Sequence, residues 1–295
     1  MKTFLNILLC MITFSLITSC SSNDSSDITS SSIPFSDSQV VGSWEIIKST
    51  STESDFSVGK RALYFENGSC LGFHAQERRF ELREGKMYTF KNGDESIAVY
   101  SLQSINQSGT DTILNIKVNS ILDNSPIDIT VRKYEEFPNW KNRNDQQFMS
   151  WYQKGKALAK AGGNWEVINN YSGMANSPTD YIVMQIIDAG KEDSRPSYSD
   201  MVSINCRGRL IPSASYPQGL VIDQTFTGSY NPSTVIPYKC KVSDFIVGLG
   251  TALLHMNRGG HYIVYIPYQL AFGSCEKNII PAYSMLIYEI WLIDF

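Results

Sequence analysis

Hydrophobic and polar residues alternate in short runs over the first half of the chain, between Gln39 and about Glu135. The predicted strands are Val40–Lys48, Arg61–Glu66, Ser69–His74, Arg78–Arg83, Lys86–Lys91, Ser96–Gln103, Thr112–Val118 and Ile127–Arg132. Asn67-Gly68 and Asn92-Gly93 stand between strands, where tight hairpin turns need positive φ. Eight short antiparallel strands within about 100 residues predict a small β-barrel or a β-sandwich.

After the predicted barrel strands, the spacing of the apolar residues changes to that of a helix. Phe148, Trp151 and Tyr152 are spaced i, i+3 and i+4, which predicts a helix over Gln146–Ala161 with Asp145 as its cap. We expect its aromatic face to pack against a neighbouring domain, and we assign residues 136–177 to a helical connector.

The last part of the chain mixes strands with one short helix. The predicted strands are Tyr181–Asp188, Met201–Leu210, His261–Pro267 and Met285–Phe295. Ser243-Asp244 is a good helix cap, and it precedes the apolar stretch Phe245–Met256. This order predicts an α+β domain in which an antiparallel sheet wraps one short helix.

Composition and charge narrow the function classes. The 295 residues suggest two domains, and 42% hydrophobic residues can form at least one sizeable core. Only 18% of residues are charged, and 25 Lys and Arg face 29 Asp and Glu. This balance gives the protein no positive surface potential that would attract nucleic acid, so we expect no nucleic-acid partner.

The N-terminus is predicted to be a signal peptide. Lys2 is the only charge in the first 19 residues, and the apolar run Phe4–Thr18 is too short for a convincing membrane span. Ile17-Thr18-Ser19-Cys20 resembles the bacterial lipobox, in which the signal is cut before a cysteine that carries lipid. The alternative is an ordinary signal peptide with an incidental Cys20.

The lipobox resemblance implies a lipid anchor on Cys20 and a place in the bacterial cell envelope. Residues 1–19 would be removed, and residues 20–37, which are rich in serine, would form a flexible tether. We expect the outer membrane, with the protein facing the periplasm or the outside.

The remaining cysteines and the histidines give no metal signature. They are Cys70, Cys206, Cys240, Cys275, His74, His255 and His261, with no CxxC or HExxH spacing. We therefore expect no zinc site and structural roles for the three histidines. Whether Cys206 and Cys240 form a disulfide or remain free thiols stays open.

The opening of the first strand carries a short family motif. Gly42-Ser43-Trp44 resembles the Gly-x-Trp start of lipocalins, whose tryptophan packs across one end of the barrel. Residues 38–135 are accordingly assigned to a lipocalin-like barrel. A barrel of this size can also be filled by its own side chains, without a ligand cavity.

Residues 178–295 resemble an FKBP-type peptidyl-prolyl cis-trans isomerase. The matching segments, in order, are Tyr181–Gly190, Ser199–Leu210, Leu220–Asp223, Phe245–Leu249, Tyr265–Gly273 and Ile279–Asp294. The resemblance implies a catalytic pair, Asp223 and Phe272. It also implies a substrate-binding set of Cys206, Ile222, Tyr238, Phe245, Ile246, Leu249, Ile280 and Tyr288.

Several of these positions depart from the family pattern. Cys206 and Phe272 stand where the family has tyrosines, and Leu249 stands where it has tryptophan. Ile222 and Tyr288 replace phenylalanines. We expect a pocket that stays apolar but is wider than usual.

The chemistry implied by the resemblance needs no cofactor and no metal, because an apolar pocket can favour the twisted, less delocalised imide. The first hypothesis is a lipid-anchored isomerase that helps exported proteins fold by acting on their proline-containing segments. The second is a catalytically weak or inactive FKBP-like peptide-binding module that works with the barrel, which would be a small-ligand or protein-interaction domain. The third is a small-ligand carrier built on the barrel.

Overall fold

The computed structural model describes residues 32–120, 122–173, 175–190 and 194–295. The predicted signal peptide, Cys20 and most of the predicted tether lie outside the described residues. Within the described ranges, no helix is long and apolar enough to cross a membrane.

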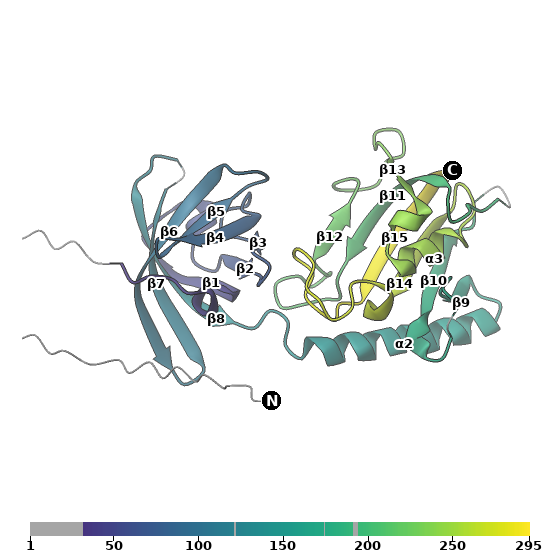
Figure 1. The fold of residues 1–295 in the computed structure, drawn as a ribbon, viewed down its shortest axis with the longest axis horizontal. Coiled ribbons are helices and arrows are strands. Elements are labelled where there is room, and N and C mark those ends of the chain that lie inside the picture. Colours follow the sequence, from purple (N-terminus) through teal and green to yellow (C-terminus); the bar gives the residue numbers. More distant parts are fainter. Residues whose placement is uncertain (1–31, 121, 174, 191–193) are drawn as a thin grey trace, which may run out of the picture. The chain divides into compact units, whose positions relative to one another are not determined.

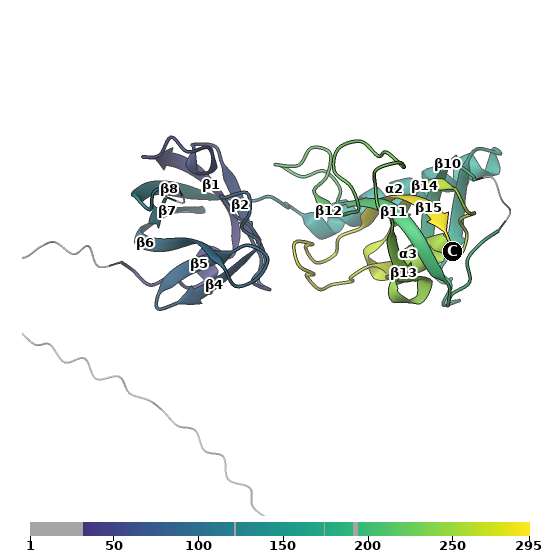
Figure 2. The same ribbon diagram turned by 90° about the horizontal axis from the view of Figure 1, so that it is seen from above.

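The N-terminal strands form a single antiparallel sheet that nearly closes into a barrel (Figures 1 and 2). The strands are β1 (Gly42–Ser49), β2 (Arg61–Tyr64), β3 (Cys70–Leu71), β4 (Arg79–Arg83), β5 (Lys86–Phe90), β6 (Ser96–Ser108), β7 (Asp111–Asn119) and β8 (Pro126–Tyr134), with a short helix α1 (Asp37–Val40) and a 3-10 turn η1 (Ser54–Phe56). Their order is β3-β2-β1-β8-β7-β6-β5-β4. The two outer strands meet through Phe80 N–H, which donates to Gly68 O at 2.9 Å, and Cys70 N–H, which donates to Arg78 O at 2.9 Å. This confirms the predicted antiparallel barrel.

The barrel is filled by its own side chains. Trp44, Phe73 and Tyr100 are buried inside it, and Trp44 Nε1–H donates to Val40 O of α1 at 2.8 Å. The cavity that remains beside Trp44 and Phe73 measures about 10 Å³, which is the space of roughly one water. The interior beside Trp44 therefore has no room for a small ligand, whereas a separate cavity of about 670 Å³ opens beside Val41, Phe80 and Lys133 of the barrel.

Residues before the predicted barrel boundary at residue 38 already pack on the barrel. Ile33 N–H donates to Leu102 O at 2.8 Å, and Phe35 is buried in the barrel core. Phe35 N–H also donates to Gly85 O at 3.0 Å. Gly85, at φ +73°, forms a tight turn with Glu84, at φ +50°. The last residues of the predicted tether are thus part of the barrel's packing.

The connector contains a 21-residue helix, α2 (Trp140–Lys160). The prediction of its start was wrong, because α2 begins six residues before Gln146. Its cap is Asn139, and Asp145 lies inside the helix, where it accepts from Lys141 Nζ at 2.7 Å. Tertiary packing explains the longer helix: Trp140 is buried, and its Nε1–H donates to Ser284 Oγ at 2.9 Å.

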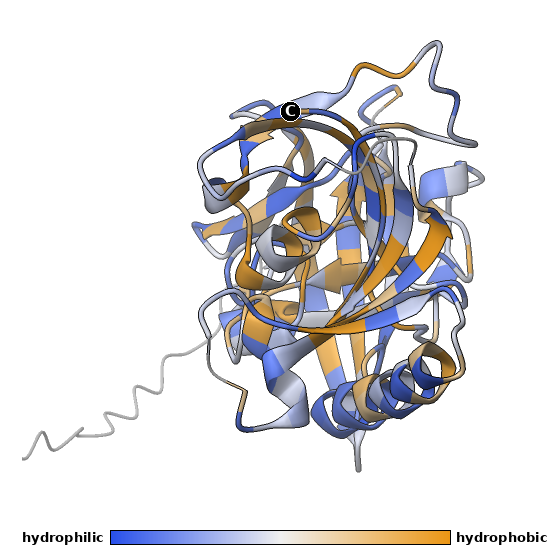
Figure 3. Ribbon diagram, turned by 90° about the vertical axis from the view of Figure 1, so that its right-hand side faces the viewer, coloured by the Kyte–Doolittle hydropathy of each residue, from blue (hydrophilic) through white to orange (hydrophobic). Residues whose placement is uncertain are grey.

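The C-terminal strands form a second antiparallel sheet. They are β9 (Trp165–Asn169), β10 (Tyr181–Asp188), β11 (Met201–Arg209), β12 (Val221–Gln224), β13 (Tyr238–Lys241), β14 (His261–Ile266) and β15 (Leu286–Asp294), with 3-10 turns η2 (Pro178–Asp180), η3 (Val242–Asp244) and η4 (Tyr268–Leu270). The order is β12-β11-β15-β14-β10-β9, and β13 also pairs with β11. Figure 3 shows hydrophobic and hydrophilic residues alternating along these strands, as expected for strands whose two faces differ.

Two helices pack on opposite faces of this sheet. Tyr265 and Ile266 are neighbours on β14, so their side chains point to opposite faces. Tyr265 stacks on Trp151 of α2, with ring centroids 4.1 Å apart. Ile266 lies so close to Gly248 of the short helix α3 (Val247–Leu253) that a Cβ there would be 2.2 Å from its Cγ2. The sheet with one short helix against its inner face confirms the predicted α+β domain.

Helix α3 is shorter than the predicted stretch Phe245–Met256. Ser243 and Asp244 do not cap it, which corrects the prediction. Both lie in the 3-10 turn η3, and the cap of α3 is Ile246, which makes no side-chain hydrogen bond to the helix. Burial of nearly the whole helix, from Gly248 to Leu253, holds it in place instead.

Candidate active site

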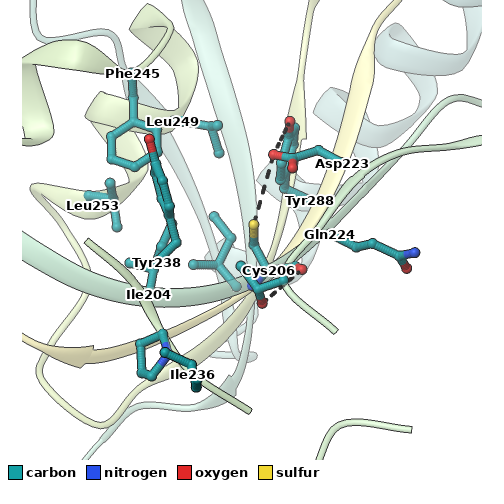
Figure 4. A pocket seen from close by; sticks show the side chains of 13 residues that line it. Ile204, Cys206, Asp223, Gln224, Ile236, Tyr238, Phe245, Leu249, Leu253 and Tyr288 are labelled. Carbon is teal, nitrogen blue, oxygen red and sulfur yellow. Dashed lines mark hydrogen bonds between the residues drawn. The ribbon is translucent and has the colours of Figure 1, made fainter. Parts of the chain in front are cut away.

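A cavity of about 640 Å³ opens beside α3. Strands β11, β12, β13 and β15, helix α3 and the segment before β13 supply its walls (Figure 4). The lining residues are Ile204, Cys206, Asp223, Gln224, Thr225, Ile236, Pro237, Tyr238, Phe245, Leu249, Leu253, Tyr288 and Ile290.

The base of the cavity is apolar and buried. Ile204, Leu253 and Ile290 are fully or almost fully buried. The rim is apolar as well but open to solvent: Ile236 is 87% exposed and Tyr238 is 54% exposed. Tyr238 meets Phe245 edge to face, with ring centroids 6.4 Å apart. Such a cavity can bury an apolar ring while leaving the rest of a peptide in water.

One side of the cavity carries its polar groups. The Tyr288 hydroxyl donates to Asp223 Oδ2 at 3.2 Å, and the Cys206 thiol lies 4.0 Å from the same oxygen (Figure 4). Burial, and then the Asp223 carboxylate, raise the pKa of Cys206 to about 12. The same two causes raise the pKa of Tyr288 above its ordinary value. Both groups therefore keep their protons near neutral pH.

Comparison with known proteins gives this region a family. Residues 192–293 match the family model described as FKBP-type peptidyl-prolyl cis-trans isomerase. The C-terminal part of the chain is an FKBP-type domain. The match includes every residue that lines the cavity, so the FKBP-type domain contains the whole candidate site.

Two curated bacterial proteins are similar to the FKBP-type domain. The FKBP-type peptidyl-prolyl cis-trans isomerase FkpA of Escherichia coli K12 is 30% identical over 113 residues, which are 38% of this chain and 37% of that protein. The FkpA of Buchnera aphidicola from Acyrthosiphon pisum is 35% identical over 79 residues, which are 27% of this chain and 32% of that protein. The chain thus spans about a third of the length of these curated relatives.

Two solved structures are similar to the chain at lower sequence identity. The crystal structure of FkpA from Escherichia coli covers 52% of this chain and 63% of its own, at 24% identity and a TM-score of 0.34. A peptidyl-prolyl cis-trans isomerase from Pseudomonas syringae covers 52% of this chain and 93% of its own, at 22% identity and a TM-score of 0.36.

The fold brings six of the ten predicted site residues to the cavity. They are Cys206, Asp223, Tyr238, Phe245, Leu249 and Tyr288. The other four, Ile222, Ile246, Phe272 and Ile280, do not line it. Ile222 precedes Asp223 on β12, where neighbouring side chains point to opposite faces. Phe272 and Ile280 lie in the segment between η4 and β15. The roles of these four stay predictions.

Sequence reasoning missed several walls of the FKBP-type site. Ile204 and Ile290 lie two residues from Cys206 and Tyr288 on the same strands, so period-two spacing could have found them. Ile236 and Pro237 directly precede Tyr238, but they lie in the loop before β13, where no periodicity marks them. Cys206 and Cys240 are free thiols; Cys240 is paired in register with Val202, four residues from Cys206.

The cavity of the FKBP-type site is lined mainly by apolar side chains, and Asp223 is the single carboxylate among its lining residues. No lining residue is a histidine or a lysine that could serve as a base for the Cys206 thiol. Among the described residues, no three His, Cys, Asp or Glu side chains gather as a metal site would require. The arrangement suits a reaction that breaks no bond and needs only a bound, twisted amide.

Proposed function

We propose that this chain is a peptidyl-prolyl cis-trans isomerase that assists the folding of exported proteins. The observation that carries the proposal is the match of residues 192–293 to the FKBP-type isomerase family. The apolar cavity beside Asp223 supports it, because the cavity can take a proline ring and keep water from the X-Pro bond.

The proposed mechanism lowers the barrier to rotation about the X-Pro bond, which is about 18–20 kcal/mol. The proline ring enters between Phe245 and Leu249, above the buried base formed by Ile290. As the amide twists, it loses delocalisation, and apolar surroundings favour this less polar state over the planar one. Asp223, at the polar edge, orients the polar groups of the peptide next to the proline.

A second candidate is a peptide-binding module with little or no turnover. Cys206 and Leu249 favour it, because they replace two aromatic side chains of the family pattern in a cavity of about 640 Å³. A proline ring held loosely gains affinity from apolar burial but is less constrained in the twisted state.

The anchor and the location belong to the same proposal. Lipid on Cys20 would hold the chain at the bacterial outer membrane, with residues 21–31 as spacer between the membrane and the barrel. The support is the lipobox-like Ile17-Thr18-Ser19-Cys20. A small ligand, if the barrel carries one, would occupy the cavity of about 670 Å³ beside Phe80 and Lys133, because the interior beside Trp44 holds only about 10 Å³.

An isomerisation assay on the full chain in detergent tests the function. Peptides with several different residues before proline are compared for wild type, Asp223→Ala and Asp94→Ala. Asp94 is a matched control, since its side chain is fully exposed on the barrel. The enzyme is supported if wild type and Asp94→Ala accelerate exchange and Asp223→Ala does so less. Peptide binding without acceleration supports the binding module. If wild type neither binds the peptides nor accelerates their exchange, both candidate functions are overturned.

A further inference from the structure

Three residues on three strands form a row across the polar side of the cavity. Tyr288 on β15 is paired in register with Gly208 on β11, and Gly208 is paired with Asp223 on β12. The Tyr288 side chain crosses over β11 and donates its hydroxyl hydrogen to Asp223 Oδ2 at 3.2 Å. The two partners of this hydrogen bond therefore sit two strands apart.

Gly208 makes this crossing possible. A Cβ on Gly208 would lie 2.6 Å from Cζ and 2.7 Å from Cε1 of Tyr288. Real Cβ atoms do not come this close to a ring, so a side chain at position 208 would push the ring away from Asp223. The missing side chain gives the tyrosine its path across the strand.

Cys206 explains why the crossing matters here. The resemblance places a tyrosine at this position, where its hydroxyl would lie beside the aspartate. In this chain the thiol is 4.0 Å from Asp223 Oδ2 and is a weak donor at best. The tyrosine hydroxyl is instead supplied by the neighbouring strand, at a position where the family has phenylalanine.

We propose that Tyr288 is a positioning residue that holds the Asp223 carboxylate toward the cavity, in place of the hydroxyl that Cys206 lacks. The inference rests on the proposed function, because the held carboxylate serves the bound proline peptide. Tyr288 is 5% exposed, whereas Asp223 is exposed, so a rigid donor fixes a carboxylate that would otherwise rotate in solvent.

The test removes the tyrosine hydroxyl from position 288 on β15 and then places one at position 206 on β11. Tyr288→Phe keeps the ring and removes only the hydroxyl, and we expect kcat to fall about tenfold with KM nearly unchanged. Cys206→Tyr in the Tyr288→Phe background returns a hydroxyl to β11, and we expect it to restore most of the lost kcat. Cys206→Phe in the same background is the matched control, which adds a ring without a hydroxyl and should restore nothing.

The outcomes separate the inference from the proposed function. An active wild type with an unchanged Tyr288→Phe variant overturns the inference and leaves the function standing. So does equal rescue by Cys206→Phe and Cys206→Tyr, because only filled space would then matter. If wild type has no isomerase rate, the function fails, and the same four chains are compared for affinity to a proline peptide. Weaker binding in Tyr288→Phe, restored only by the second tyrosine, supports the inference; equal or absent binding overturns it.

Discussion

Trp151 of α2 stacks on Tyr265 of β14, with ring centroids 4.1 Å apart and planes 22° from parallel. Trp165 of β9 stacks on the same tyrosine at 6.0 Å, and Lys154 lies over both tryptophan rings. Helix α2 and strand β9 are therefore built into the C-terminal sheet, although both precede the segment that matches the FKBP family.

Replacing Trp151 should weaken the FKBP-type domain. Trp151→Ala removes the ring that joins α2 to the sheet, and we expect it to lower the free energy of unfolding by about 3 kcal/mol. Denaturant unfolding followed by near-UV circular dichroism measures the change. Gln146→Ala, an exposed site on the same helix, should change it by less than about 0.5 kcal/mol. Equal stability of Trp151→Ala and wild type would mean that α2 is not part of the domain.

Glu77 is a fully buried carboxyl inside the barrel. Its Oε1 accepts from the Tyr100 hydroxyl at 2.6 Å and the Thr89 hydroxyl at 2.8 Å. Burial raises the pKa of Glu77 to about 7, although these two hydrogen bonds lower it, and Asp55 adds a small upward effect. Tyr64 and Cys70 are the other titratable groups that sense its charge, and burial raises the pKa of both.

The barrel should lose stability as pH rises from about 4.5 to about 7. The folded state holds the Glu77 proton more tightly than the unfolded state, so folding is favoured below this window and less favoured above it. At about pH 7, the free energy of unfolding of the barrel should be lower by about 3 kcal/mol than below pH 4.5. Amide hydrogen exchange of β5 and β6, which carry Thr89 and Tyr100, measures the stability of the barrel separately from the FKBP-type domain. Glu77→Gln should flatten the profile, and an unchanged slope in this variant would assign the effect to other groups.

Leu249 stands on the cavity wall where the family has tryptophan. Leu249→Trp should narrow the cavity and bury about 50 Å² more of a bound proline peptide, which corresponds to about 1.2 kcal/mol. We therefore expect the Kd for the peptide to fall about sevenfold. Titration calorimetry with a proline peptide measures the change. Leu254→Trp is the control, since Leu254 follows α3 and does not line the cavity. Weaker binding by Leu249→Trp would show that the proline ring does not use this wall.

Cys20 should decide where the protein is found. Cys20→Ser removes the atom that would carry lipid, so the protein should move from the membrane fraction to the soluble fraction after cell lysis. Cys275→Ser replaces an exposed, free thiol of the C-terminal part and should leave the distribution unchanged. A Cys20→Ser protein that stays with the membrane would contradict the lipid anchor.

The sequence predicted all eight barrel strands because their signal is local, although the strand predicted at Ser69–His74 is only Cys70–Leu71. Period-two alternation fixes which residues face inward, and turn residues such as Asn67-Gly68 mark where each strand ends. The start of α2 was missed because Asp145 is a good capping residue, whereas the actual start depends on Trp140 reaching Ser284, far along the chain. Strand β9 was missed because it pairs only with β10 and has no period of its own.

The candidate site was predicted in part for the same reason. The family resemblance found Asp223, Phe245 and Leu249 from short motifs in sequence order. It could not find the hydrogen bond between Asp223 and Tyr288, which joins residues 65 positions apart across an intervening strand. That contact depends on sheet register and on the space above Gly208, which only the folded chain reveals.

The most direct test of the central claim is exchange NMR on a proline peptide mixed with a small amount of the full chain. Uncatalysed cis–trans exchange takes about 10–100 s, too slow for exchange peaks on a mixing time of about one second. The account predicts that wild type produces exchange peaks between the cis and trans forms, and that Asp223→Ala weakens them. Wild-type spectra without exchange peaks, at protein concentrations that bind the peptide, would contradict an isomerase.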